Sequence, residues 1–264
     1  MNKLFVTERR HKIMEMLNQE QRLTVKRLAK VLGVSEVTLR SDLKEMEKEG
    51  LLHRTHGGAM LPKDSVSDNN IPFYSRERKN KNEKRLIAQE ALPFIHDGQC
   101  ILLDASSTAL ELARLLKDTT LRLTIVTSGI YTALELRENS NFTVIILGGV
   151  VRQGSSSLEG VLGSNVLDQV YVDTMFTSAN GFTINTGLTD FNMHEVELKV
   201  EMVKKSSDVI ALVDHTKIGK SSISSFAALE DISTLITNKP LDNDLNQSLE
   251  QQDIKIIVPE AALS

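Results

Sequence analysis

Residues 33–43 read Gly-Val-Ser-Glu-Val-Thr-Leu-Arg-Ser-Asp-Leu, a tight turn followed by the start of an amphipathic helix. Ser35 is placed to cap this helix, and its apolar residues recur at helical spacing, at Leu39, Leu43 and Met46. A helix that begins directly after a short glycine-containing turn is typical of the second half of a helix-turn-helix. The stretch therefore predicts a small helical domain at this end of the chain.

The residues before the turn have the spacing of a first helix. Apolar side chains recur there at i, i+3, i+4 and i+7, at Val25, Leu28, Ala29 and Leu32. Thr24 is placed to cap the start of this helix and Gly33 to end it. A further helix is expected over residues 7–18, and residues 51–58 predict a strand and the turn of a small wing.

The outer face of the second helix is polar and suits DNA. Short hydroxyl and apolar groups near its start match base edges and thymine methyls, whereas Arg40 and Lys44 match guanine or phosphate. Basic residues of the wing would extend the same surface. We predict DNA contacts at Ser35, Glu36, Val37, Thr38, Arg40, Ser41, Lys44, Arg54 and His56. The alternative is an ordinary amphipathic helix with a solvated outer face.

The charge distribution favours an anionic partner at the N-terminal end. The chain has 264 residues and a formal net charge of −4. Residues 1–60 hold 12 bases and 8 acids, whereas the remainder holds 19 bases and 27 acids. Because no amphipathic apolar anchor accompanies the basic end, nucleic acid is favoured over a membrane surface.

Composition and missing motifs exclude several classes of protein. With 41% hydrophobic and 25% charged residues, the chain is an ordinary globular protein. A single cysteine, Cys100, cannot form an intramolecular disulfide, and no signal peptide or run of about 20 apolar residues is visible, so we expect a cytoplasmic protein. The histidines show no metal-ligand spacing and no glycine-rich nucleotide motif occurs, so neither a metal nor a cofactor is expected.

The larger part of the chain repeats a strand–loop–helix pattern. Continuously apolar or β-branched runs occur at residues 100–103, 123–126, 144–147, 208–213 and 235–236. Helical stretches are expected at 82–94, 108–116, 130–136 and 195–205. Such runs suit parallel strands buried on both faces, so we predict a doubly wound α/β domain. The charged residues of the last helix are interpreted as a solvated face: Glu195, Glu197, Lys199 and Glu201.

The predicted architecture is α/β, an N-terminal winged helix-turn-helix plus a larger doubly wound effector domain. The expected boundaries are residues 1–58 for the first domain, 59–75 for a polar linker and 76–264 for the second domain.

Candidate ligand residues follow the apolar runs. In an open α/β sheet, ligands bind at the carboxyl ends of the strands, where helix N-termini and hydroxyl groups suit a phosphate. Paired glycines there allow close approach of a ligand, and a carboxylate or a lysine suits a sugar hydroxyl or a phosphate. The predicted effector residues are Asp104, Ser106, Ser107, Thr108, Thr127, Ser128, Gly148, Gly149, Asp214 and Lys217. In any one loop, a hydroxyl that merely caps a helix is the alternative.

Several of these motifs together resemble one protein family. The segments 34–43, 47–50, 54–59, 83–88, 104–108, 127–128, 147–149 and 214–217 are similar to the DeoR family of bacterial sugar-catabolism regulators. The resemblance implies a winged helix-turn-helix joined to a sensor domain similar to ribose-5-phosphate isomerase, which responds to a phosphorylated sugar.

Two functions from different classes follow from these patterns. The leading hypothesis is a repressor of a carbohydrate-utilisation operon that binds double-stranded operator DNA and a phosphorylated sugar. The alternative is a sugar-phosphate isomerase-like enzyme with a nucleic-acid-binding appendage. The related isomerases carry acidic residues near a segment where this chain has Thr177 and Asn180, so we predict no catalytic residue. A homo-oligomer is expected, because one helix-turn-helix reads only a few base pairs.

Overall fold

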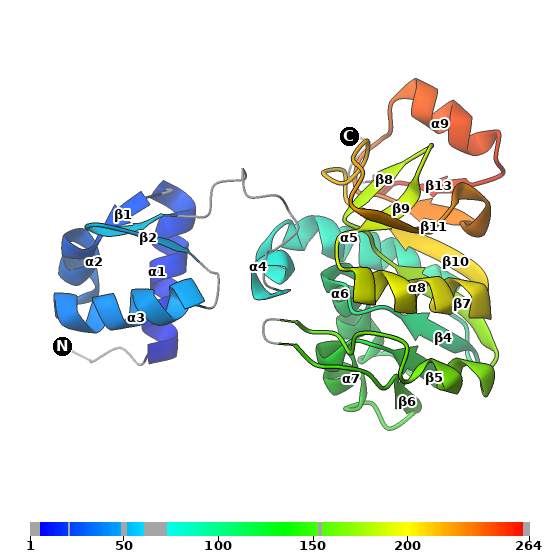
Figure 1. Cartoon of the computed structure of the whole chain (residues 1–264), viewed down its shortest axis with the longest axis horizontal. Coiled ribbons are helices and arrows are strands. Elements are labelled where there is room, and N and C mark those ends of the chain that lie inside the picture. The colour runs from blue at the N-terminus through cyan, green and yellow to red at the C-terminus, as the bar shows by residue number, and fades with distance from the viewer. Residues whose placement is uncertain (1–5, 21, 49–51, 61–72, 153–154, 261–264) are drawn as a thin grey trace. The chain divides into compact units, whose positions relative to one another are not determined.

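The computed structural model describes residues 6–20, 22–48, 52–60, 73–152 and 155–260. The chain divides into two compact units, residues 1–76 and 77–264 (Figure 1). Among the described residues, no helix has the length and apolar character needed to cross a membrane.

The first unit is a winged helix-turn-helix, as predicted. Its helices are α1 (Val6–Glu20), α2 (Val25–Leu32) and α3 (Glu36–Lys48). Its strands are β1 (Arg22–Thr24), β2 (His53–Thr55) and β3 (Gly58–Met60). β3 lies between β1 and β2 and is antiparallel to both. The sequence pattern did not predict β1, the third strand of this sheet.

Local chemistry sets the helix ends in this unit. The Thr24 hydroxyl accepts a hydrogen bond from the Arg27 N–H at 3.2 Å, and the Ser35 hydroxyl accepts one from the Thr38 N–H at 3.2 Å. Gly33 ends α2 in the left-handed region, with φ 65°. Both predicted caps and the predicted stop are therefore confirmed. The residues buried between the helices and the wing include Ile13, Leu17, Leu28, Leu39, Leu43 and Met46.

The last strand of the wing begins at a required glycine. A Cβ atom on Gly58 would lie 1.9 Å from the Leu23 carbonyl oxygen, so β3 and β1 can pair this closely only with glycine here. β3 ends at Met60, inside the predicted linker 59–75. Residues 61–72 of that linker lie outside the described residues, and the domain boundaries stay predictions.

The second unit is built on a parallel sheet of seven strands. Their order is β13-β12-β10-β7-β4-β5-β6, and every neighbouring pair is parallel. The strands are β4 (Cys100–Leu103), β5 (Leu123–Thr127), β6 (Phe142–Ile146), β7 (Val172–Thr177), β10 (Ser206–Leu212), β12 (Thr234–Ile236) and β13 (Lys255–Ile257). The predicted parallel α/β sheet is confirmed.

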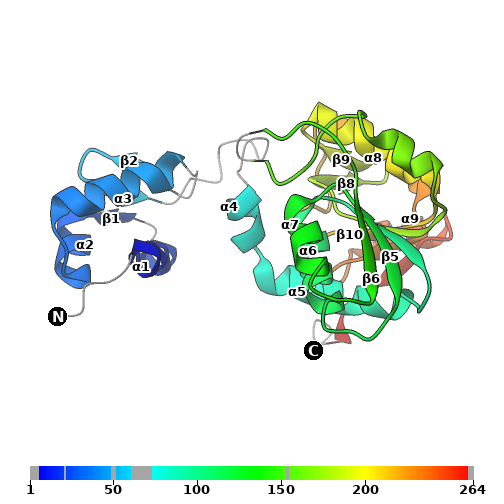
Figure 2. The same cartoon turned by 90° about the horizontal axis from the view of Figure 1, so that it is seen from below.

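Helices cover both faces of this sheet (Figure 2). On one face α5 (Lys81–Ala91), α6 (Ser107–Leu116) and α7 (Ile130–Leu136) contribute buried apolar side chains. On the other face α8 (Met193–Lys205) and α9 (Asn243–Glu250) do so. A short helix, α4 (Phe73–Arg78), precedes α5. The sheet is therefore doubly wound, as predicted.

Smaller elements complete the second unit. An antiparallel sheet of three strands contains β8 (Gly181–Thr183), β9 (Gly187–Asp190) and β11 (Ser224–Ala227). Three 3-10 turns span Leu92–Phe94, Ser164–Asp168 and Leu229–Asp231.

The direction of winding reverses between β4 and β7. From β4 the chain proceeds outward to β5 and β6, whereas from β7 it proceeds the other way to β10, β12 and β13. Ligands of open α/β sheets bind in the crevice at the carboxyl ends of the strands, where this reversal occurs. Residues 104 and 178, which follow β4 and β7, therefore flank the expected position of a site.

Candidate functional site

A buried lysine of α8 lies at the reversal point of the sheet. The Lys199 Nζ donates to the Asp190 Oδ2 at 2.9 Å and to the Ser178 carbonyl oxygen at 2.8 Å, and it lies 3.0 Å from the Asp104 Oδ2. The three charged side chains are 0–6% exposed. The prediction of a solvated face is wrong for Lys199, because this side of α8 faces the strand ends. Glu197, on another side of the helix, is exposed.

The charges in this cluster stabilise one another. Burial raises the pKa of the Asp104 carboxyl, but the charge of Lys199 and the hydrogen bonds from Ser106 and Thr177 lower it by more. Burial lowers the pKa of the Lys199 ammonium, but the charges of Asp104 and Asp190 raise it by more. Both groups are therefore charged at neutral pH.

Asp104 ties together the loops that follow β4 and β7. Its Oδ1 accepts from the Ser106 N–H at 3.0 Å. Its Oδ2 accepts from the Thr177 hydroxyl at 2.7 Å and from the Ser178 N–H at 3.1 Å. Both carboxylate oxygens thus have protein partners, and Asp104 fixes the geometry of the reversal point. Its contact with an effector stays a prediction.

A small pocket lies beside Lys199. It is lined by Ala105, Ser128, Ser157, Leu158, Glu195, Leu198, Lys199 and Met202. Its volume of about 10 Å³ holds about one water molecule. Ser128 alone of the predicted effector residues lines it. Sequence reasoning missed Glu195 and Lys199, although their i, i+4 spacing on α8 places both on one side of the helix.

The two hydroxyl-rich loops both use part of their hydrogen-bonding groups within the protein. Before α6, the Ser106 hydroxyl accepts from the Ala109 N–H at 3.1 Å, and the first-turn residues Ser107 and Thr108 are buried beside it. Before α7, the Gly129 N–H donates to the Thr127 hydroxyl at 3.0 Å and the Ile130 N–H donates to the Ser156 carbonyl oxygen at 2.9 Å. The Ser106 N–H also has an acceptor, the Asp104 Oδ1 at 3.0 Å, so amides at the start of both helices are already bonded within the protein and a phosphate at either start stays a prediction.

The glycines after β6 have a packing role. A Cβ atom on Gly149 would lie 2.6 Å from the Glu159 carbonyl oxygen, and one on Gly163 would lie 2.2 Å from the Gly148 N. The close approach at Gly148 and Gly149 is therefore made by the backbone of residues 159–163. A ligand contact of these glycines stays a prediction.

Asp214 and Lys217 lie after β10, outside the pocket lining. The Asp214 Oδ1 accepts from the Asn80 Nδ2 at 3.2 Å and from the Thr216 N–H at 3.0 Å. The Lys217 Nζ donates to the Asn180 Oδ1 at 3.1 Å. Neither of these two predicted effector residues lines the pocket that Ser128 lines, and their role stays a prediction.

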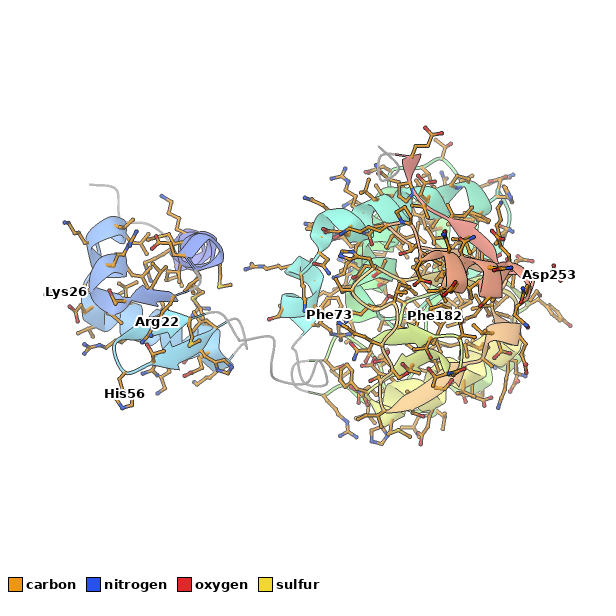
Figure 3. All side chains as sticks on the ribbon, turned by 90° about the horizontal axis from the view of Figure 1, so that it is seen from above. Arg22, Lys26, His56, Phe73, Phe182 and Asp253 are labelled. Atoms are coloured by element: carbon orange, nitrogen blue, oxygen red, sulfur yellow. The ribbon has the colours of Figure 1, made fainter. Side chains whose placement is uncertain are left out.

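The predicted DNA-contact residues lie on one helix and the wing. On α3, Val37, Arg40, Ser41 and Lys44 are exposed and Glu36 and Thr38 are partly exposed. Ser35 is exposed before α3, and Arg54 and His56 are exposed in the wing. Arg40 forms an exposed ion pair with Glu36 at 3.0 Å. Figure 3 also shows Arg22 and Lys26, two basic side chains of this unit that sequence reasoning did not single out.

A buried ion pair holds α3 in place. The Arg9 Nε donates to the Asp42 Oδ2 at 2.5 Å and the Arg9 Nη2 donates to the Asp42 Oδ1 at 3.1 Å. Both side chains are buried between α1 and α3. Asp42 therefore faces inward, while Arg40 and Lys44 face solvent.

Comparison with known families settles the relationship of the chain. Residues 9–65 match the DeoR-like helix-turn-helix domain and residues 79–239 match the DeoR C terminal sensor domain. The chain belongs to the DeoR family. Over 97% of its length it is 42% identical to all of the HTH-type transcriptional regulator GolR of Listeria innocua. Over 95% of its length it is 28% identical to 98% of the glycerol-3-phosphate regulon repressor of Escherichia coli.

The DeoR-family assignment confirms the resemblance that the sequence motifs predicted. It makes this chain a DNA-binding transcriptional regulator with a C-terminal sensor domain. Among solved structures, the chain is similar to a D-ribose-5-phosphate isomerase in complex with phospho-erythronic acid, with 22% identity, a TM-score of 0.40, and coverage of 52% of this chain and 54% of that one.

Proposed function

We propose that this DeoR-family protein represses a carbohydrate-utilisation operon and that a phosphorylated sugar in its sensor domain changes its affinity for operator DNA. The exposed polar face of α3 carries the proposal, because Val37, Arg40 and Lys44 are presented to solvent while the opposite face of the helix is buried. The name of the Escherichia coli relative supports a phosphorylated effector. The protein would act in the cytoplasm, where operator DNA lies.

We further propose that the sensor domain binds its ligand without turnover. General acid–base catalysis works best with groups whose pKa lies near the operating pH. At the reversal point, the pKa of the Asp104 carboxyl is lowered and the pKa of the Lys199 ammonium is raised. Both pKa values therefore lie further from neutral pH than those of the free side chains, which makes both groups poor general acids or bases. The isomerase alternative predicts that the purified protein interconverts aldose and ketose phosphates, which a coupled assay measures directly.

The recognition-helix proposal predicts that Arg40→Ala loses affinity for operator DNA but keeps its thermal stability. Removing a contact to a base costs about 1–3 kcal/mol, which corresponds to about a 5- to 150-fold weaker operator affinity. Thermal unfolding should be unchanged, because Arg40 is exposed. Fluorescence anisotropy with an operator fragment over a range of salt concentrations measures the effect. Arg137→Ala in the sensor domain, also an exposed arginine, is the matched control. Operator affinity equal to that of the parent at every salt concentration would contradict the assignment of α3.

The effector proposal predicts that Lys217→Ala abolishes the ligand response while operator binding persists. A lysine supplies a full positive charge for a phosphate, and Ser107 lies in the first turn of α6, where backbone amides favour an anion. The measurement is release of an operator fragment as a panel of phosphorylated sugars is titrated. If Lys217→Ala and Ser107→Ala both kept the sensitivity of the parent to the active sugar phosphate, this effector site would be abandoned.

We also propose a homo-oligomer that assembles mainly through the sensor domain. Specific operators are read as two half-sites, and a symmetric dimer matches them with two copies of α3. Sedimentation at micromolar concentration should therefore give a mass of at least two chains. A monomer that binds the operator at full affinity would rule this out.

A further inference from the structure

The junction of α4 and α5 carries a positive charge that the rest of the sensor domain lacks. Residues 77–85 hold five bases and two acids, whereas residues 86–264 hold 12 bases and 23 acids. One of the two acids of this segment, Glu77, already forms an ion pair with Arg114 of α6. The segment is therefore a basic feature on an acidic domain, and the function proposed above gives it no role.

Three cations of this segment form one exposed basic surface. Arg78 ends α4, and Lys81 and Arg85 lie four residues apart on the same side of α5. All three side chains are exposed, whereas Ile87 and Ala88, on the opposite side of α5, are buried in the core. Among the residues that the structure describes, none of the three cations has a carboxylate within ion-pair distance.

This basic surface differs from other exposed cations of the same unit. The side-chain nitrogens of Arg122, Lys204 and Lys205 lie 2.5–2.9 Å from a carboxylate oxygen. A neighbouring carboxylate cancels much of the attraction that a cation exerts on an external anion. The basic surface keeps that attraction, which favours a partner with a row of negative charges over a single small anion.

The protein holds the backbone of this junction in place. Asn80 lies between the two helices in the left-handed region, with φ 53°. Its Nδ2 donates to the Asp214 Oδ1 at 3.2 Å and to the Thr216 hydroxyl at 3.3 Å. The Lys84 Nζ, which is buried, donates to the Lys79 carbonyl oxygen at 2.6 Å. The basic surface therefore stands on a fixed part of the sensor domain, so a partner need not order the backbone beneath it.

Duplex DNA is the polyanion that the chain itself brings near this surface. DNA carries one negative charge per about 1.7 Å of its axis. The twelve residues 61–72 cannot separate Met60 from Phe73 by more than about 47 Å, a little over one turn of DNA. DNA bound by the helix-turn-helix is thus held at high effective concentration for the sensor domain of the same chain.

We propose that Arg78, Lys81 and Arg85 bind the phosphate backbone of the DNA that flanks the helix-turn-helix. This second contact is independent of base sequence, because cations on phosphates fix the position of a protein without reading base edges. The inference rests on the DNA-binding function and adds that the sensor domain itself contacts DNA. It assigns part of the affinity for DNA to residues outside the winged helix-turn-helix.

The test measures how strongly salt weakens DNA binding. The full-length protein is titrated onto a 40-base-pair duplex of mixed sequence by fluorescence anisotropy, at salt concentrations from 50 to 200 mM. Each phosphate contact adds about 0.9 to the slope of log affinity against log salt. With three contacts, the parent should lose about 40-fold more affinity over this range than a triple variant with Arg78→Gln, Lys81→Gln and Arg85→Gln. Thermal unfolding of this variant should match that of the parent, because the three side chains are exposed.

Two control variants separate a local contact from an effect of net charge. A triple variant with Arg122→Gln, Arg137→Gln and Lys239→Gln removes the same charge from exposed positions elsewhere in the unit and should keep the salt slope of the parent. A double variant with Arg78→Lys and Arg85→Lys keeps the charge of the basic surface and should also keep that slope. Equal losses of slope in the two glutamine variants would overturn the inference.

The remaining outcomes distinguish this inference from the DNA-binding function. If the parent and the variant of the basic surface have the same salt slope, the inference is overturned and binding by the helix-turn-helix stands. If the parent does not bind the duplex even at 50 mM salt, the DNA-binding function fails as well. Sedimentation of both proteins tests a second, acidic copy of the chain as the partner: a smaller mass for the variant would assign the surface to that copy and overturn the contact with DNA.

Discussion

Replacing Lys199 with methionine is expected to destabilise the sensor domain by about 3–5 kcal/mol, because it removes the positive charge between two buried carboxylates. Asp104 and Asp190 would remain in the interior without their counter-charge. Urea unfolding at pH 7, followed by circular dichroism, measures the loss. Lys204→Met is the matched control, since its exposed pair with Glu201 on the same helix is worth less than about 1 kcal/mol.

The pH dependence of unfolding should weaken in Lys199→Met. In the parent, the folded-state pKa of Asp104 is lowered. Its contribution to stability is therefore present above the unfolded value near 3.9 and is lost as the pH falls through the lower folded value. Without Lys199, the hydrogen bonds from Ser106 and Thr177 remain to oppose burial, so the folded-state pKa of Asp104 is lowered less and the stability lost on acidification should be smaller than in the parent.

A companion variant keeps this prediction decisive if Lys199→Met folds poorly. Adding Asp104→Asn and Asp190→Asn removes the unpaired charges together with the lysine, and should recover much of the lost stability. Parallel pH profiles for the parent and Lys199→Met would show that the ion cluster contributes nothing to folding.

The sequence predicted those parts of the fold whose burial is one-sided or complete. In the first unit each helix buries one stripe, so apolar spacing and the caps at Thr24 and Ser35 were sufficient. In the sheet, β4 and residues 209–212 of β10 are buried on both faces and appear as unbroken apolar runs. These patterns follow directly from solvent exclusion, which does not depend on knowing the partner element.

The sequence patterns did not predict the central strand, β7, or the buried charge of Lys199, and the reason is the same for both. β7 carries Asp173 and Thr174 within its apolar run, and the Asp173 carboxylate accepts from the Cys100 N–H at 2.8 Å on the neighbouring strand. Lys199 is buried only because Asp104 and Asp190, 95 and 9 residues away, surround it. The spacing of residues in one sequence indicates which apolar groups are buried. Burial of a charge depends instead on partners elsewhere in the chain, and local spacing does not identify them.

The helix-turn-helix contains a second buried charge pair, and Asp42→Ala is expected to destabilise that domain by about 3–5 kcal/mol. The reason is geometric, since the Arg9 guanidinium makes two hydrogen bonds to Asp42, with distances of 2.5 and 3.1 Å, between α1 and α3. Hydrogen exchange of the α3 amides in the full-length protein measures the loss locally, without interference from the sensor domain.

The same Asp42→Ala change should also weaken operator binding, although Asp42 faces away from DNA. Its removal leaves the recognition helix without its fixed contact to α1, so the side chains on the outer face of α3 are no longer held for base contacts. Glu45→Ala is the matched control on the same helix: its pair with Lys48 is exposed, so both hydrogen exchange and operator affinity should stay close to those of the parent.

Replacing both partners, with Arg9→Met and Asp42→Leu, should give a more stable domain than either single change, because no buried charge is then left unpaired. Wild-type exchange rates in Asp42→Ala would mean that apolar packing alone positions α3.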